Sequence, residues 1–211
     1  MLKLNQKGLF IFDFDGVLVD SVQVKTQAFA SLYQNFGEDV VNKVTEYHLG
    51  NGGMSRFEKF RYYHQYILGL TIDDDLVEEM SQKFSKLVVD KIVSSKEING
   101  VTEFLENCMD RGVVCCVNSA TPEDELVRII RLRNWSKYFQ FIFGSPSSKF
   151  KNSEKILSKT NICRTVAVFF GDDVNDFNAA KASNIDFIGI NYSAKNKTNP
   201  DQYVDFSQIE F

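Results

Sequence analysis

Apolar runs that end in polar clusters recur along the chain and predict the buried strands of a sheet. The clearest runs are residues 9–12 (LFIF), 113–117 (VVCCV) and 166–170 (VAVFF). Short continuous runs rich in Val, Ile and Phe are typical of strands that are covered on both faces. Weaker strand candidates are residues 139–143, 187–190 and 203–206.

Segments with helical spacing, such as residues 101–109 and 124–130, lie between these runs. Strands that alternate with helices predict an α/β fold with a parallel sheet covered by helices. Residues from about 20 to 96 break the alternation, because they contain no convincing strand and have the apolar spacing of several amphipathic helices. We therefore expect a helical insert after the first strand.

The composition is that of a globular chain with a substantial core, since 44% of its 211 residues are hydrophobic. The net charge of −4 argues against nucleic acid as the main partner, because binding a phosphate backbone requires concentrated Lys and Arg. No apolar stretch approaches the roughly twenty residues of a membrane span, and the first residues lack a signal-peptide pattern. We expect a cytoplasmic protein with no membrane partner. The four cysteines lack metal-ligand spacing, and we expect them to be buried.

Two carboxylates, Asp13 and Asp15, follow the first apolar run. Their spacing puts both on the same side of an extended chain, and ligands of a parallel sheet bind beyond the carboxyl ends of its strands. Carboxylates this close resist sharing their negative charge unless a proton or a cation relieves it. The pair therefore indicates a metal, a perturbed pKa or both, and the alternative is a solvated strand end followed by a turn.

Four strand-end clusters resemble, in type and order, the four motifs of the haloacid dehalogenase superfamily of phosphatases. Residues 13–21 (DFDGVLVDS) resemble the first motif, DxDGxxxDS, and residues 119–122 (SATP) resemble the second. Residues 144–149 (GSPSSK) are similar to the third, whose essential element is a Lys, and residues 171–176 (GDDVND) match the fourth, GDxxxD. The resemblance covers essentially the whole chain.

This resemblance implies an α/β fold with a Rossmann-like three-layer core and a mainly parallel sheet. Residues 1–19 and 97–211 would form that catalytic core. Residues 20–96 would form an α-helical cap, inserted after the first strand, that selects the substrate and excludes water.

The resemblance also implies roles for the motif residues. Asp13 would attack the phosphorus of a phosphomonoester and form an aspartyl-phosphate. Asp15 would protonate the leaving oxygen and then activate the water that releases phosphate. Ser119 and Lys149 would hold the phosphoryl oxygens, together with the backbone amides that follow Asp13 and Ser119.

A bound Mg²⁺ is implied as the cofactor, because oxygen ligands suit this hard cation. Its protein ligands would be the Asp13 carboxylate, the Asp15 backbone carbonyl and Asp172. Asp173 and Asp176 would lie behind these ligands and orient them or water. The register of the motif favours Asp172 over Asp173 for the direct contact.

Other interpretations exist for the two phosphate-binding candidates. Lys149 competes with Lys151 and Lys155 for the lysine role, and any of them can be an ordinary solvated lysine. Ser119 can instead be a helix cap before Pro122.

Further substrate-binding candidates are Gly16 and Ala120 in the core and Arg56 and Lys59 in the insert. Many members of the family have Asn or Gly at the position of Ala120. The alanine removes a possible side-chain contact and keeps the backbone amide. Arg56 and Lys59 can meet an anionic part of the substrate, and a solvated helix face is the competing interpretation.

The insert also contains two histidines and many aromatic residues. We expect His48 and His64 at the polar surface of the insert. We expect the aromatic residues to form its core; they are Phe57, Phe60, Tyr62, Tyr63 and Tyr66.

The first functional hypothesis is a Mg²⁺-dependent phosphatase that acts on a small phosphorylated metabolite, such as a sugar phosphate or a phosphoglycolate-like acid. A sugar phosphomutase with the same core residues, or a noncatalytic binding protein that retains the fold, are the alternatives. Asp15 argues against dehalogenation and phosphonate cleavage, which do not need an acid at this position. We expect a monomer or a homodimer.

Overall fold

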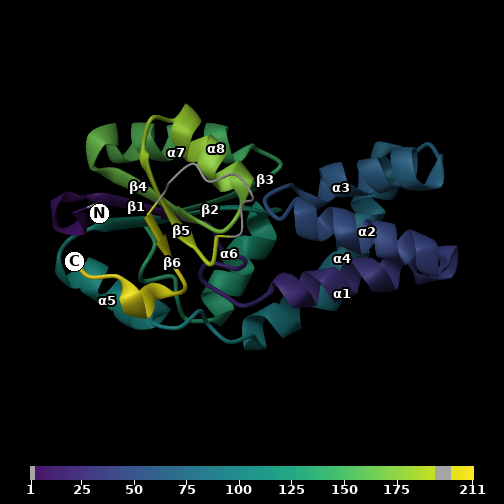
Figure 1. Cartoon of the computed structure of the whole chain (residues 1–211), viewed down its shortest axis with the longest axis horizontal. Helices are drawn as coiled ribbons and strands as arrows, with labels where there is room; N and C mark the ends of the chain where they lie inside the picture. Colours follow the sequence, from purple (N-terminus) through teal and green to yellow (C-terminus); the bar gives the residue numbers. More distant parts are fainter. Residues whose placement is uncertain (1–2, 193–200) are drawn as a thin grey trace.

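A six-stranded sheet forms the centre of the computed structural model, which describes residues 3–192 and 201–211. Neighbouring strands pair in parallel in the order β3-β2-β1-β4-β5-β6 (Figure 1). The strands are β1 (Leu9–Phe12), β2 (Val114–Pro122), β3 (Phe141–Ser145), β4 (Ala167–Gly171), β5 (Asp186–Ile190) and β6 (Asp201–Tyr203). The prediction of an α/β fold with a parallel sheet is confirmed.

Helices cover both faces of this sheet (Figure 1). They are α5 (Val101–Asp110) and α6 (Glu123–Leu132) on one face, and α7 (Lys149–Thr160) and α8 (Val174–Ala182) on the other. Successive side chains of a strand point to opposite faces. Phe10 and Phe12 of β1 accordingly pack into the cluster that contains the apolar residues of α5 and α6, whereas Leu9 and Ile11 pack with those of α7 and α8. This double burial explains why β1 is a continuous apolar run.

Four helices form the insert: α1 (Val22–Tyr33), α2 (Glu38–Gly50), α3 (Arg56–Tyr62) and α4 (Asp74–Ser94). A π-helical segment, Tyr63–Leu68, continues α3. Residues 22–94 are all described, and they contribute no strand to the sheet. The insert lies to one side of the core (Figure 1). The remaining elements are 3-10 turns at Leu4–Gln6, Gln34–Phe36, Arg164–Val166 and Phe206–Gln208.

Aromatic rings pack at the centre of the insert, as expected for Phe60 and Tyr63, which are fully buried. The ring of Phe29 lies 5.6 Å from each of these rings and 4.4 Å from that of Phe84. Full burial of such a side chain contributes about 1.5–3 kcal/mol. The expectation is wrong for Tyr66, which is 66% exposed.

The surface positions expected for His48 and His64 are also wrong, because both side chains are buried. Nδ1 of His64 lies 3.0 Å from the carbonyl oxygen of Phe60 and 3.2 Å from the hydroxyl of Tyr33. The His48 ring lies 4.9 Å from that of Phe29. A polar residue can be buried when the fold supplies partners, and a hydrophobic pattern contains no information on those partners.

The cysteines are buried at positions 108, 115 and 116, but Cys163 is exposed, contrary to expectation. It lies between α7 and a 3-10 turn, outside the apolar runs.

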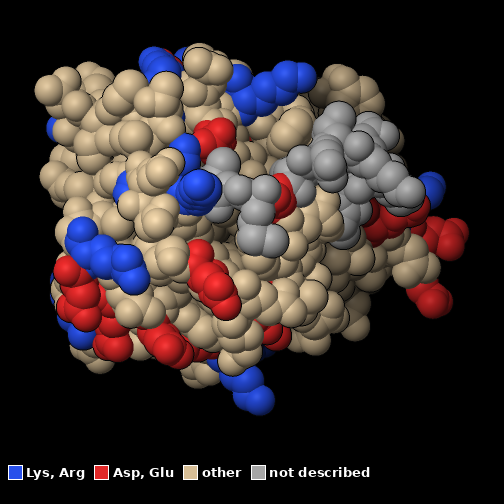
Figure 2. Space-filling model, turned by 60° about the vertical axis from the view of Figure 1, so that its left-hand side comes forward, with Lys and Arg blue, Asp and Glu red and all other residues tan. Residues whose placement is uncertain are grey.

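Within the described residues, no helix has the length and apolar character needed to cross a membrane. On the face in Figure 2, the acidic and basic side chains of the described residues are interspersed, and these residues form no continuous basic strip there.

Candidate active site

The carboxyl ends of β1, β2 and β4 meet the insert around a cavity of about 340 Å³. The core contributes Asp13 and Asp15 after β1, Ser119 to Thr121 at the end of β2, and Asp172 and Asp173 after β4. The insert contributes cationic and aromatic side chains; among them are Lys25, Phe29, His48, Arg56 and Lys59. We call the side of the site that holds Asp13, Asp172, Asp176 and Lys149 the core floor. The facing side, which holds Arg56, Lys59 and His48 of the insert, is the cap wall.

Asp13 is 5% exposed and has a partner for each of its carboxylate oxygens. Oδ1 accepts a 2.7 Å hydrogen bond from the backbone N–H of Phe14, and Oδ2 lies 2.7 Å from Nζ of Lys149. Lys149 also forms an ion pair with Asp176, so that one ammonium bridges two carboxylates. These contacts fix the Asp13 side chain at the end of β1 and leave it lining the cavity.

Three carboxylates gather at the core floor. Asp13, Asp172 and Asp176 each offer one oxygen, and these oxygens lie within 4.8 Å of one another. Burial raises the pKa of each of the three groups; repulsion from a neighbouring carboxylate adds to the rise, and attraction to Lys149 opposes it. Burial alone would lower the pKa of Lys149, but Asp13 and Asp176 raise it.

Among the residues that the structure describes, one ammonium therefore faces three carboxylates, and their negative charge exceeds what Lys149 neutralises. Buried groups in this situation either bind protons or take up a cation. Carboxylate oxygens are hard ligands that suit a divalent cation such as Mg²⁺ or Ca²⁺. The donor set thus fits a bound metal ion.

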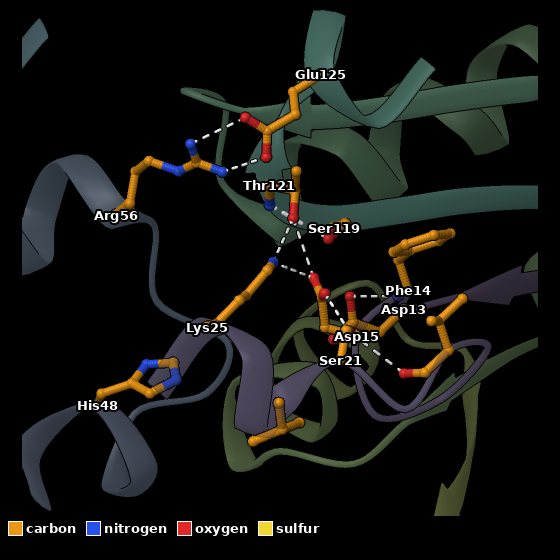
Figure 3. Close-up of polar contacts among 12 residues, drawn as sticks. Asp13, Phe14, Asp15, Ser21, Lys25, His48, Arg56, Ser119, Thr121 and Glu125 are labelled. Carbon is orange, nitrogen blue, oxygen red and sulfur yellow. Dashed lines mark hydrogen bonds and ion pairs between the residues drawn. The ribbon is translucent and has the colours of Figure 1, made fainter. Parts of the chain in front are cut away.

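Asp15 is not a member of this carboxylate cluster, and its side chain has partners of its own (Figure 3). Its carboxylate accepts hydrogen bonds from Ser21 Oγ at 2.6 Å and Thr121 Oγ1 at 3.0 Å, and it forms an ion pair with Lys25. Lys25 Nζ also donates to Thr121 Oγ1 at 2.7 Å. Burial acts to raise the pKa of Asp15, but the charge of Lys25 and these hydrogen bonds together lower it.

Lys25 and Thr121 did not emerge as site residues from the sequence. The one sequence feature that could have indicated Lys25 is its position one helical turn after Ser21, at the start of α1. That spacing indicates a shared helix face, which becomes informative only if Ser21 is known to contact Asp15.

The fourth motif separates the roles of its acids. Asp172 belongs to the carboxylate cluster, whereas Asp173 lines the cavity and caps α8 by accepting from the backbone N–H of Asn175 at 2.9 Å. Asp176 is a member of the same carboxylate cluster and forms an ion pair with Lys149. Gly16 has a φ of +79°, and a Cβ there would lie 2.2 Å from Oδ2 of Asp172, so the turn after Asp15 requires glycine.

Of the two phosphate-binding candidates, Ser119 lines the cavity directly, whereas Lys149 contacts Asp13. Oγ of Ser119 accepts from the N–H of Thr121 at 3.2 Å. It does not cap α6, which begins at Glu123 after Pro122. Ala120 lines the cavity as well.

The lysines of the third motif differ in exposure. Lys149 is buried behind Asp13, whereas Lys151 and Lys155 are exposed on α7, so the structure brings Lys149 to the site and not its two competitors.

The two cationic candidates of the insert are buried, so the interpretation of a solvated helix face is wrong for both. Arg56 forms a bidentate ion pair with Glu125 of α6 (Figure 3), and its Nη1 donates to Ser85 Oγ at 2.8 Å. Lys59 Nζ lies 2.9 Å from Nδ1 of His48. Burial, followed by repulsion from Lys25, lowers the pKa of Lys59 to about 7.

A glycine-rich loop between α2 and α3 docks the insert on the fourth motif. A Cβ at Gly53 would lie 2.8 Å from Cβ of Asn175 and 2.9 Å from Oδ1 of Asp173. The backbone can approach this closely only because the position lacks a side chain.

Sequence comparison finds similar proteins among known phosphatases. A phosphoglycolate phosphatase from Pseudomonas savastanoi pv. phaseolicola is 24% identical over 190 residues, covering 87% of this chain and 69% of that protein. A phosphorylated carbohydrates phosphatase from Thermotoga maritima is 26% identical over 190 residues, covering 84% and 82%.

The fold has a counterpart among solved structures. The crystal structure of β-phosphoglucomutase from Clostridium difficile has a TM-score of 0.81 at 19% identity and covers 97% of this chain and 94% of that chain. A family model described as haloacid dehalogenase-like hydrolase matches residues 10–190. The resemblance to phosphatases of this superfamily, inferred above from the four motifs, is thereby confirmed, and the chain belongs to the haloacid dehalogenase-like hydrolases.

Proposed function

We propose that this protein is a Mg²⁺-dependent phosphatase that hydrolyses a small phosphomonoester through an aspartyl-phosphate. The observation that supports this most directly is Asp13, a buried carboxylate held by Phe14 and Lys149 at the edge of a cavity. Residues 1–19 and 97–211 would be the catalytic core, and residues 20–96 the cap. The relatives named above act on phosphoglycolate and on phosphorylated carbohydrates, which suggests a substrate of similar size.

Asp13 would attack the phosphorus and form a covalent phosphoenzyme, which divides the displacement into two easier steps. Lys149, which already contacts Asp13, would then stabilise the negative charge of the transferred group. Ser119 and the backbone amides after Asp13 and Ser119 would position the phosphoryl oxygens.

Asp15 lies two residues beyond Asp13, with a carboxylate oriented by Ser21, Lys25 and Thr121. Its lowered pKa favours the ionised form, in which it accepts a proton from the attacking water. The negative charge of a bound phosphomonoester raises the pKa of Asp15 again and favours its protonated form. In this complex Asp15 would therefore protonate the leaving oxygen.

Asp13, Asp172 and the backbone carbonyl of Asp15 would hold Mg²⁺, and Asp173 and Asp176 would orient the site around it. When bound, Mg²⁺ would neutralise charge on the phosphate. The excess of carboxylates over ammonium groups at the core floor supports this assignment.

The test is release of inorganic phosphate from a broad panel of phosphomonoesters, with and without Mg²⁺. Native protein should release phosphate only with the metal, and Asp13→Asn should abolish release. Asp90→Asn, the same change at an exposed position of α4, serves as the control and should have native activity. Metal-independent release, or release that survives in Asp13→Asn, would contradict the mechanism. Transfer of phosphate between sugar positions without release would indicate the phosphomutase.

A further inference from the structure

Lys59, on the cap wall, is a buried ammonium that has no anionic partner among the described residues. Its side chain belongs to α3, is 2% exposed and lines the same cavity as Asp13. Its Nζ contacts His48 Nδ1 at 2.9 Å and lies 5.7 Å from the centroid of the Phe29 ring. Within residues 3–192 and 201–211, no carboxylate oxygen lies within 4.0 Å of this ammonium.

His48 offers Lys59 an acceptor but no charge. Burial and then the proximity of Lys59 lower the pKa of His48 to about 3, so the ring is neutral and accepts the hydrogen bond through Nδ1. Asp15 and Asp173 attract Lys59 at longer range, while Lys25 and Lys149 repel it. An ammonium buried in this way costs free energy unless an anion accompanies it.

The neighbouring cations of the cavity do have partners in the chain. Three cationic side chains line its described part, and they are Lys25, Arg56 and Lys59. Lys25 pairs with Asp15, and Arg56 pairs with Glu125. Lys59 is therefore the member of this set whose charge is left for a ligand.

We infer that Lys59, supported by His48, binds a second anionic group of the substrate, a carboxylate or a second phosphate, at the opposite end from the phosphoryl group that Asp13 attacks. This inference rests on the proposed function and narrows its substrate class to acidic phosphomonoesters. The arrangement of charge in the cavity supports it, because the carboxylates of the core floor repel a second anion, whereas the cap wall attracts it.

A purely structural role for Lys59 makes the opposite prediction for stability. A methionine has a similar volume and fills a buried site without the cost of a charge. If Lys59 is retained for ligand binding, Lys59→Met should raise the midpoint of thermal unfolding and impair function, which is the usual exchange at binding sites. If Lys59 stabilises the cap, the same substitution should lower the midpoint.

The experiment compares kcat/KM within two matched pairs of phosphomonoesters. One pair is 2-phosphoglycolate and 2-hydroxyethyl phosphate, which differ by a carboxylate; the other is fructose 1,6-bisphosphate and fructose 6-phosphate, which differ by a phosphate. Native protein should prefer the more anionic member of at least one pair. Lys59→Met and Lys59→Gln should reduce this preference roughly 10- to 100-fold, the range of a hydrogen bond to a charged group, and change the less anionic member little.

Lys86→Met, the same change at an exposed position of α4, is the matched control and should keep both the preference and the unfolding midpoint. Equal kcat/KM values within both pairs in native protein would overturn the inference, and so would equal losses for both members in the Lys59 variants.

Failure of the proposed function would look different, since no variant would then release phosphate from any ester. In that case a binding measurement tests whether Lys59 holds an anion. The shift in unfolding midpoint that 2-phosphoglycolate or fructose 1,6-bisphosphate produces in Asp13→Asn should disappear in Asp13→Asn/Lys59→Gln. An unchanged shift, or no shift in Asp13→Asn, would reject the anion site.

Discussion

In the described part of the chain, the buried ammonium at the core floor contacts two carboxylates, whereas one of the two buried cations of the cap wall contacts none. Lys149 bridges Asp13 and Asp176, whereas the contacts of Lys59 among the described residues are uncharged, namely the rings of His48 and Phe29. Arg56 lies one helical turn before Lys59 on α3 and has a carboxylate partner in Glu125. The comparison separates charges that the chain itself neutralises from a charge for which we propose an anionic partner in the substrate.

The largest effect is expected from removing the cation of the core floor. Lys149→Met should lower kcat/KM for phosphate release about 10³-fold, because it removes the donor that stabilises charge on the transferred group. The rate of phosphate release measures this fall in kcat/KM. Lys151→Met, two residues further along and exposed, is the control and should stay near the native value. Equal losses in the two variants would show that Lys149 has no special place in the reaction.

The second effect tests the pair that ties the cap wall to the core. Glu125→Gln leaves the Arg56 guanidinium buried without its anion, and it should lower the free energy of unfolding by about 3 kcal/mol. Urea unfolding measures this change. Asp124→Asn, at the exposed neighbouring position, should cost less than about 0.5 kcal/mol. Adding Arg56→Met to Glu125→Gln should recover part of the loss, and a double variant with fully additive losses would argue against direct coupling.

Metal binding gives a third way to examine the core floor. If Asp13 and Asp172 hold Mg²⁺, an Mg²⁺ concentration of 100 times Kd should stabilise the folded protein by about 2.7 kcal/mol. Thermal unfolding with Mg²⁺ and with a chelator measures this difference. Asp172→Asn should reduce the stabilisation strongly, whereas Asp90→Asn, which is remote and exposed, should preserve it. Equal stabilisation of all three proteins would place the metal elsewhere.

The sequence was most informative where a functional residue directly follows a strand. Residues 9–12 coincide with β1, and the run at 166–170 lies one residue from β4. Asp13 and Asp172 then lie at the same edge of the sheet, because the carboxyl ends of parallel strands face the same way and Phe12 of β1 pairs with Phe170 of β4. The edge strands were less accurate: β6 is Asp201–Tyr203 rather than 203–206, since Phe206 belongs to a 3-10 turn.

The cap wall was less predictable for a physical reason. Helical spacing indicates which residues share a face, but it does not indicate what that face will contact. Arg56 and Lys59 look alike in sequence, and only the tertiary packing, in which α4 contacts both α3 and α6, brings Glu125 to Arg56. The burial of His48 beside Lys59 depends in the same way on how α2 and α3 pack.

The last prediction uses pH to sharpen the contrast between the two cations of α3. The pKa of Lys59 is lowered to about 7, first by burial and then by Lys25, and the groups that face it are His48, Lys25, Lys149, Asp15 and Asp173. Only the charged ammonium attracts an anion. The preference for the more anionic ester should therefore be complete at pH 6 and fall by up to tenfold for each pH unit above about 7.

The ratio of kcat/KM within a matched pair is the appropriate measurement, because groups that act on both esters cancel from it. Lys59→Gln should show a small ratio that does not change with pH. Stability should respond with the opposite sign: a lysine whose folded pKa is below its unfolded value of 10.5 destabilises the fold fully below about pH 7, and this cost vanishes as pH rises toward 10.5. The stability advantage of Lys59→Met should accordingly shrink across that window. A native ratio that stays constant from pH 6 to 9 would mean that Lys59 remains charged throughout, and the distinction between the paired and the unpaired cation of α3 would then lose its energetic basis.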